Sequence, residues 1–151
     1  MNDFKKAMNY LEKGNYSEAT KLFEELAKKG EVRAQYKLGT MCYESNDYEK
    51  AAYWYEKAAV RGMDYAQYQL GLMAYEGKGV EQDYAKAFFW IKIPALHGNA
   101  EAQYQLGLMY YRGEGTYKDD KTAVAYLKEA AKQGHLEAQL TLDKISRENE
   151  K

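Results

Sequence analysis

Several residue types that support common function classes are scarce in this sequence. Its 151 residues include one cysteine, Cys42, so no disulfide can form within the chain and a reducing compartment is indicated. The 22 basic and 23 acidic residues are mixed along the sequence, so no basic stripe is available to neutralise the phosphates of a nucleic acid. No stretch reaches the roughly 20 apolar residues of a membrane span, and the opening MNDFKKAMNY lacks the apolar run of a signal peptide. These absences predict a cytoplasmic protein that binds neither nucleic acid nor a membrane.

Proline is equally scarce, because Pro94 is the only one in the sequence, whereas there are 12 glycines. This composition suits a helical chain with regular turns. With 46% hydrophobic and 30% charged residues, the chain can bury a core, which excludes intrinsic disorder. Proline lacks the backbone N–H that a helix interior needs. We therefore expect Pro94 to kink its helix or to end it early, near Ile93.

An internal repeat organises the sequence. Four segments align (RAQYKLG, YAQYQLG, EAQYQLG and EAQLTLD), and their alanines advance in steps of 32, 36 and 36 residues: Ala34, Ala66, Ala102 and Ala138. A second series advances by the same steps: Gly30, Gly62, Gly98 and Gly134. Two independent markers with the same uneven spacing establish the repeat.

Each period predicts a pair of helices. Helix A runs from about Ala34 to Glu44, with apolar residues at helical spacing on one face. Helix B follows an N-cap candidate and ends at a periodic glycine, which can adopt the left-handed conformation that closes a helix. The N-cap candidates are Asn15, Asp47, Asp83 and Asp119. The i, i+3 and i+7 residues of helix B are expected to form its packing seam: Ala19, Leu22 and Leu26; Ala51, Trp54 and Ala58; Ala87, Trp90 and Pro94; and Ala123, Tyr126 and Ala130.

The repeat predicts an all-α, right-handed α-solenoid of four helix pairs with a C-terminal capping helix. The whole chain, 1–151, is expected to form one domain. Its units are about 2–31, 32–63, 64–99 and 100–135, and the capping helix is 136–148.

Two of the units carry extra Gly-x-Gly turns between their helices, Gly77–Gly79 and Gly113–Gly115. Such turns can bind phosphate when a strand precedes them and Lys-Ser or Lys-Thr follows. No strand is predicted before these turns and no Lys-Ser or Lys-Thr directly follows their last glycine, so we interpret the turns as linkers.

The repeat unit resembles the Sel-one-like repeat, a branch of the tetratricopeptide superfamily. The resemblance rests on AQYQLGLMAYEGKGVEQDYAKAFFW and AEAQYQLGLMYYRGEGTYKDDKTAVAYLKEAAKQGH, and it is strong over about residues 32–140. The motif of that family is AxAQYxLG, then a Gly-x-Gly turn, then KAxxW or its equivalent. Residues 44–47 lack the Gly turn, and Pro94 replaces the usual alanine. The resemblance implies that helix A lines the concave surface of the solenoid.

Catalytic and metal-binding chemistry has little support. His97 and His135 flank helix-ending glycines, where they can act as caps, and the sequence contains no His/Cys cluster with metal-ligand spacing. Some secreted relatives carry a cysteine pair in each repeat and have been described as binding or hydrolysing β-lactams. That activity is not carried over, because Cys42 stands alone. We expect no enzyme, no metal and no cofactor; a small-ligand binder or hydrolase is the alternative.

The 16 tyrosines carry the main functional hypothesis. Helix A holds six of them in two registers seven residues apart, close to two helical turns, so both registers share one face. Two interpretations stay open: the rings pack between adjacent A helices, or they line a groove for a partner. Tyrosine offers a large contact area and a hydrogen-bonding tip. The predicted partner-binding residues are Tyr36, Tyr43, Tyr65, Tyr68, Leu72, Tyr75, Glu76, Tyr104, Leu108, Tyr111 and Arg112.

The expected function is a monomeric, non-catalytic module that binds a protein or peptide partner on this face. The resemblance implies that small bacterial proteins of this type act as regulators or adaptors, or as immunity proteins that block a toxin. The sequence does not identify the partner.

Overall fold

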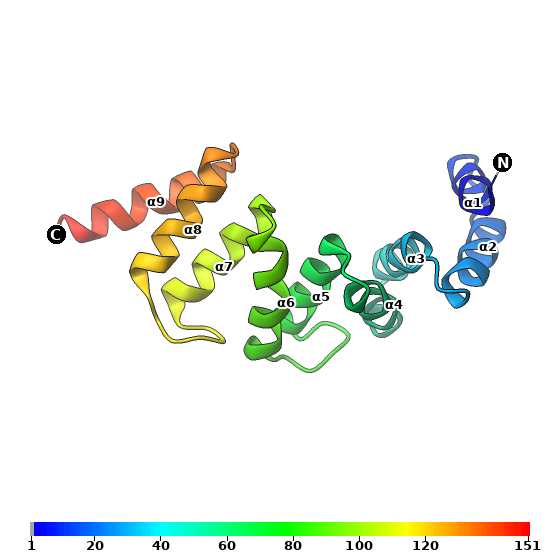
Figure 1. Cartoon of the computed structure of the whole chain (residues 1–151), viewed down its shortest axis with the longest axis horizontal. Helices are drawn as coiled ribbons and strands as arrows, with labels where there is room; N and C mark the ends of the chain where they lie inside the picture. The colour runs from blue at the N-terminus through cyan, green and yellow to red at the C-terminus, as the bar shows by residue number, and fades with distance from the viewer. Residues whose placement is uncertain (1) are drawn as a thin grey trace. The chain divides into compact units, whose positions relative to one another are not determined.

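The chain is all-helical over the part described by the computed structural model, residues 2–151, which contain nine α-helices and no strand (Figure 1). The helices are α1 Asp3–Glu12, α2 Tyr16–Lys28, α3 Val32–Glu44, α4 Tyr48–Val60, α5 Asp64–Glu76, α6 Tyr84–Leu96, α7 Ala100–Arg112, α8 Asp120–Lys132 and α9 Leu136–Asn149. Helices that follow one another in sequence pack together. The predicted all-α solenoid of helix pairs is therefore confirmed.

The chain separates into two compact units. The N-terminal unit runs to Leu70 and includes Lys78–Glu81. The C-terminal unit comprises Gly71–Gly77 and Gln82–Lys151, so the division falls within α5. Helices α1 to α4 form the core of the first unit, and α6 to α9 form that of the second.

The repeated Ala-Gln pair joins each helix A to the helix B before it. The alanines of all four segments are completely buried. Each of the first three glutamines is also buried, and its side-chain amide reaches back to a carbonyl oxygen of the preceding helix B at 3.1–3.2 Å. The pairs are Gln35 with Ala27, Gln67 with Ala59, and Gln103 with Ala95. A buried amide needs such a partner, so this bond fixes how far one helix can slide past the other.

The glycine of the repeated motif allows helix B to approach helix A closely. A Cβ atom on Gly39 would lie 2.8 Å from the Tyr55 ring, and one on Gly107 would lie 2.9 Å from Leu127. Gly71 is approached in the same way by Ile91, at 2.6 Å. These contacts are too short for a methyl group, so the motif requires glycine at this position.

The predicted seam of helix B is wrong by one residue at its centre. The large side chains that are fully buried there are Phe23, Tyr55, Ile91 and Leu127, whereas Leu22, Trp54, Trp90 and Tyr126 are half-buried. Helix B packs on the helix A before it and on the helix A after it. The buried stripe is therefore wider than one seam, and the predicted residues lie at its edge.

The capping predictions hold for three of the four B helices. The carboxylates of Asp47, Asp83 and Asp119 each accept a hydrogen bond from the backbone N–H three residues later, at 3.1–3.4 Å. Asn15 also precedes its helix, but its side chain makes no such bond, so that prediction is wrong. The periodic glycines that end the B helices all have φ between 88° and 96°, as expected.

Pro94 does not end its helix early, because α6 continues to Leu96. The position lies in the last turn, so the helical bond that proline cannot form is lost near the end of the helix rather than at its centre. The Pro94 carbonyl accepts bonds from the N–H groups of His97 and Asn99, at 3.2 and 3.0 Å, and the ring is buried.

The buried phenol of Tyr55 makes stability depend on alkaline pH. The side chain is 2% exposed, and its hydroxyl donates to Thr40 Oγ1 at 3.1 Å. Burial raises the pKa of Tyr55 from 10.0 to about 12. Between these values the unfolded chain releases the proton while the folded chain keeps it, so the free energy of unfolding falls as pH rises. We expect Tyr55→Phe to lose less stability than the wild type from pH 10 to 12. Urea unfolding of both proteins across this range tests it, and parallel losses would contradict it.

Candidate functional site: the tyrosine face of the A helices

In the N-terminal unit, the predicted tyrosines pack on other rings. The ring of Tyr36 lies 5.7 Å from that of Tyr55 and 6.3 Å from that of Tyr65. Tyr43 meets Tyr48 edge to face at 5.0 Å. Tyr36, Tyr43 and Tyr68 are half-buried, whereas Tyr65 is 62% exposed. Tyr65 is therefore the member of this group that offers most of its ring to a partner.

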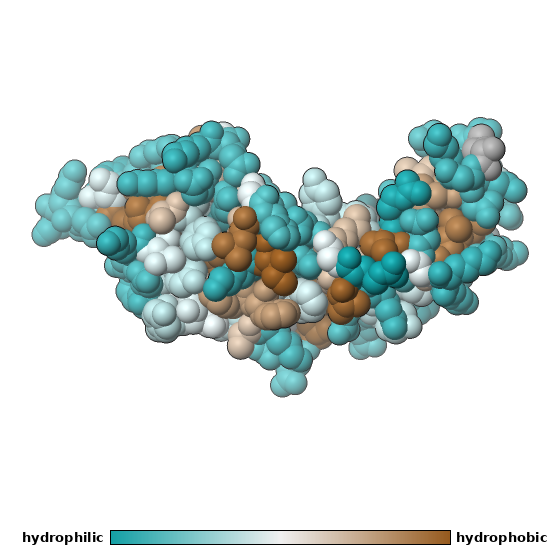
Figure 2. Space-filling view, in the orientation of Figure 1, coloured by the Kyte–Doolittle hydropathy of each residue, from teal (hydrophilic) through white to brown (hydrophobic). Residues whose placement is uncertain are grey.

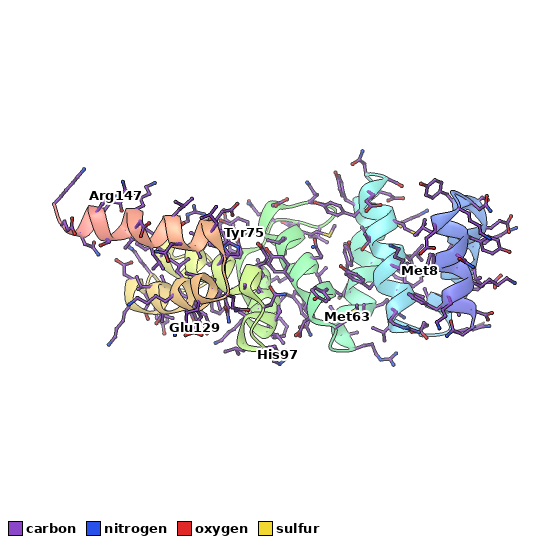
Figure 3. All side chains as sticks on the ribbon, turned by 90° about the horizontal axis from the view of Figure 1, so that it is seen from above. Met8, Met63, Tyr75, His97, Glu129 and Arg147 are labelled. Carbon is purple, nitrogen blue, oxygen red and sulfur yellow. The ribbon has the colours of Figure 1, made fainter. Side chains whose placement is uncertain are left out.

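In the C-terminal unit, Tyr75 is the centre of a polar and aromatic cluster at the end of α5 (Figure 3). Its hydroxyl donates to Glu114 Oε1 at 2.7 Å and accepts from Arg112 Nη1 at 3.4 Å. Its ring lies 5.0 Å from that of Tyr84. Burial, followed by the bond to Glu114, raises the pKa of Tyr75. This hydroxyl therefore stays protonated and able to donate.

Tyr111 connects α7 to α9. Its hydroxyl donates to Glu148 Oε2 at 3.0 Å, and this bond is the main cause that raises the pKa of Tyr111. The Lys118 ammonium lies 4.4 Å above the ring and donates to the Tyr111 carbonyl at 2.9 Å. Tyr111 is therefore bonded on both sides, which favours a structural role for part of its surface.

Tyr104 stacks on His135, with 4.7 Å between ring centroids. Nδ1 of His135 accepts the Ala138 N–H at 3.1 Å and so caps α9. The other nitrogen, Nε2, lies 3.1 Å from Glu101 Oε1. Because Nδ1 accepts, Nε2 carries the proton and donates to Glu101. His135 thus joins α9 to α7, in agreement with its predicted capping role.

The Gly-x-Gly turns link helix A to helix B, as predicted, and they also take part in the packing. A Cβ atom on Gly79 would overlap the Tyr48 carbonyl, and one on Gly115 would overlap the Tyr84 carbonyl. The middle residue of each turn reaches a tyrosine of the preceding repeat. In the first turn, Lys78 donates a hydrogen bond to the Tyr43 hydroxyl at 3.4 Å. In the second turn, Glu114 accepts one from the Tyr75 hydroxyl. The second turn therefore clamps its own repeat to the one before it, and the first turn packs on the preceding repeat within the N-terminal unit.

Comparison with known proteins identifies the repeat. Residues 64–99 and 100–135 each match the Sel1 repeat, and residues 4–66 match a tetratricopeptide repeat. A Sel1 repeat protein from Oxalobacter formigenes is 32% identical in its solved structure, with a TM-score of 0.72, over 81% of this chain and 95% of that one. The chain belongs to the Sel1 repeat family.

Two further solved structures are similar to this Sel1 repeat chain. A protective antigen with an SLR fold, from uropathogenic Escherichia coli strains, is 34% identical with a TM-score of 0.75, over 80% of this chain. The present chain spans only 27% of that protein. Helicobacter pylori cysteine-rich protein B is 22% identical with a TM-score of 0.62, over 93% and 95% of the two chains, and shows the fold alone. No curated protein sequence gives a significant match. Sel1 repeats typically mediate protein interactions and are mostly non-catalytic scaffolds.

Within each unit, only some of the predicted residues of the tyrosine face contact one another. The structure joins Tyr36 to Tyr65 in the first unit and Tyr75 to Arg112 in the second. Leu72 and Leu108 are half-buried, and Glu76 and Arg112 are exposed at helix ends.

Sequence reasoning missed several residues that shape this Sel1 tyrosine face. Tyr48 and Tyr84 both occupy the first position of helix B, a shared register that could have revealed them. Lys78 and Glu114 also share a register, but their opposite charges concealed their common role.

The large exposed apolar side chains of the Sel1 units lie mainly on the B helices. They include Tyr53 and Val60 on α4 and Phe89 and Leu96 on α6. Figure 2 shows hydrophobic side chains at the surface over α6. A hollow of about 730 Å³ in the N-terminal unit also lies against the B helices α2 and α4, and none of the predicted site residues lines it.

Within residues 2–151, no group of three or more His, Cys, Asp or Glu residues could hold a metal ion. Over the same described range, no helix is both long and apolar enough to cross a membrane.

Proposed function

We propose that this Sel1 repeat protein is a non-catalytic, cytoplasmic module that holds a single protein partner on the tyrosine face of its A helices. A regulator of one protein, or an immunity protein that neutralises a toxin, is the form of this function we favour. The contact is centred on Tyr75, Tyr111 and Arg112 in the C-terminal unit.

The observation that carries the proposal is the cluster of Tyr75, Arg112 and Glu114. Tyrosine and arginine are the side chains most enriched where truncation weakens protein interfaces. Here the Arg112 side chain is 53% exposed, while Tyr75 and Glu114 hold its guanidinium at 3.4 and 3.8 Å. A cation positioned in this way loses little freedom when it binds.

We expect Arg112→Ala to weaken partner binding about 30-fold, which corresponds to about 2 kcal/mol. The ion pair that it removes is long, at 3.8 Å, and the Arg112 side chain is half exposed, so the pair contributes only about 0–1 kcal/mol to folding and the variant stays folded. Tyr75→Ala is a poorer probe, because it also removes packing on Tyr84.

The test is affinity capture from the native cell by the wild type, Arg112→Ala and Lys132→Ala, followed by mass spectrometry and a measured Kd for the recovered protein. Lys132 is a matched control, since it is an exposed cation paired with Glu129 on α8. A protein retained by the wild type and the control but lost by Arg112→Ala supports the proposal. Equal retention by all three would overturn it, and a toxin gene adjacent to the coding sequence would favour the immunity role.

A further inference from the structure

The hollow of the N-terminal unit has the size and lining of a binding groove. Its volume of about 730 Å³ falls within the roughly 300–1,000 Å³ of sites that hold small molecules. Helix α3 forms its floor, and α2 and α4 form its walls. The apolar residues that line it are Leu11, Leu38, Met41, Cys42 and Trp54, with Tyr16 and Tyr53 at the rim. Tyr16 and Tyr53 are 64% and 53% exposed, so the groove is bordered by accessible rings.

In the C-terminal unit, side chains of the protein itself occupy the equivalent space between α6, α7 and α8. There, Phe88 of α6 meets Tyr110 of α7 edge to face, with 5.4 Å between centroids. Tyr110 in turn stacks on Tyr126 of α8 at 5.9 Å, with the rings 8° from parallel. Three aromatic rings in contact therefore fill the space between two B helices and the A helix that separates them.

The repeat register explains why the N-terminal unit is hollow. Thr20 stands where the other unit has Phe88, and Cys42 stands where it has Tyr110. Trp54 stands at the position of Tyr126 and keeps its aromatic ring. The first unit has thus lost two rings and retained the third. The open space is therefore suited to an aromatic ring supplied from outside, which would contact Trp54 as Tyr110 contacts Tyr126.

The chemistry of the floor agrees with an apolar guest. Cys42 is half-buried, and burial is the main cause that raises the pKa of its thiol. It is therefore a neutral side chain beside Met41 and Leu38 rather than a thiolate. Trp54 is held edge to face by Tyr53 at 4.9 Å, so the indole is oriented before any guest arrives.

Charges at the two ends of the groove give it a direction. Successive helices run in opposite directions, so the end of α2 lies beside the start of α3. Lys28 and Lys37 lie toward this end with Glu24, for a net charge of +1. At the other end the lining residues are Glu44, Asp47 and Lys50, for a net charge of −1.

We propose that this groove docks a segment of a partner protein through one aromatic side chain. An acidic residue of that segment faces Lys28 and Lys37, and a basic residue faces Glu44 and Asp47, since opposite charges then meet at both ends. The groove lies on the other side of α3 from Tyr36 and Tyr43. It is thus a second contact surface, and it does not depend on the tyrosine face binding anything.

The first experiment selects binders from a displayed library of random 12-residue peptides on the full chain. The same library is counter-selected on Thr20→Phe/Cys42→Tyr, which restores the two rings of the other unit. We expect the selected peptides to share one aromatic residue, and to bind the filled variant at least 10-fold more weakly by calorimetry. Replacing that aromatic residue with alanine should weaken binding to the wild type by a similar factor. Peptides that bind both proteins equally, or that lack an aromatic residue, would overturn the proposal.

Two further measurements locate the peptide. Cys42 is the one thiol of the chain and lines the groove, so a bound peptide should slow its reaction with a thiol reagent. Lys37→Glu should weaken peptides that carry an acidic residue at that end, whereas Arg112→Ala should bind them normally. An unchanged thiol rate, or equal binding by Lys37→Glu, would contradict the assigned site. Normal binding by Arg112→Ala keeps this test separate from that of the tyrosine face.

Competing occupants give different outcomes. A chain that sediments as a dimer, and as a monomer when the groove is filled, would assign the groove to a second copy and overturn the proposal. N-acetyl-tryptophanamide binding as tightly as the peptides would assign it to a small aromatic molecule, with the same consequence. The melting temperature of the filled variant is measured first, and Thr20→Phe alone replaces it if the double variant does not fold.

Discussion

Gly115→Ala should destabilise the C-terminal unit by about 2–5 kcal/mol. The residue has φ of 75°, and a left-handed alanine costs about 1–2 kcal/mol. The new methyl group would also overlap the Tyr84 carbonyl, which is backbone and cannot rotate away. Forcing packed atoms apart costs about 1–3 kcal/mol more. Urea unfolding gives the difference in free energy.

Gly134→Ala is the matched control for this substitution. Gly134 lies in the same unit with φ of 88°, and no atom lies within 4 Å of the position of its missing Cβ. It should therefore show only the backbone cost of about 1–2 kcal/mol. If the two variants lose the same stability, Gly115 is a flexible turn residue and the clamp described for the Gly-x-Gly turn is wrong.

The second large effect is expected where α8 packs on α7. Leu127 is completely buried, and Leu127→Ala should cost about 2–5 kcal/mol. Gly107→Ala should also destabilise, by about 1–3 kcal/mol, although alanine is the better helix former by about 1 kcal/mol. The reason is the 2.9 Å approach of Leu127 to the place where the methyl group would stand.

The double variant decides whether these two effects share one cause. In Gly107→Ala/Leu127→Ala, the added methyl group enters the space that the leucine has vacated, so the clash disappears. We expect a total loss smaller than the sum of the single losses by about 0.5–3 kcal/mol, the usual coupling between residues in contact. Additive losses would show that the motif glycine serves another purpose than close approach.

The repeat and the helix pairs were predictable because their signals are local. A capping aspartate such as Asp83, or a left-handed glycine such as Gly98, is recognised from the residues beside it. The family resemblance rested on the same local strings, and both it and the fold class are confirmed.

The packing of helix B was harder to predict. Trp54 is larger and more apolar than Tyr55, so periodicity alone placed it at the centre of the seam. In the structure Tyr55 is buried because Gly39 opens a space for its ring on one side and Thr40 accepts its hydroxyl. Both reasons lie in another helix, where the periodicity of helix B carries no information.

The candidate sites differ in the same respect. The tyrosine registers were visible in the sequence, and their binding role stays a prediction. The groove was not visible, because it consists of what Thr20 and Cys42 fail to fill. It becomes apparent only when their register is compared with the contacts that Phe88 and Tyr110 make in the folded chain.

The joint between repeats is a hydrogen bond between a tyrosine hydroxyl of helix A and the middle residue of a Gly-x-Gly turn, and the charge of that residue can vary. A phenol can both donate and accept a hydrogen bond. Tyr43 accepts from a lysine in the next turn, whereas Tyr75 donates to a glutamate at the same position. The joint therefore forms with either sign of charge. Repeats of this kind can be copied, exchanged and recharged one at a time, so the electrostatic pattern that a partner meets can diversify while the stack that displays it stays the same.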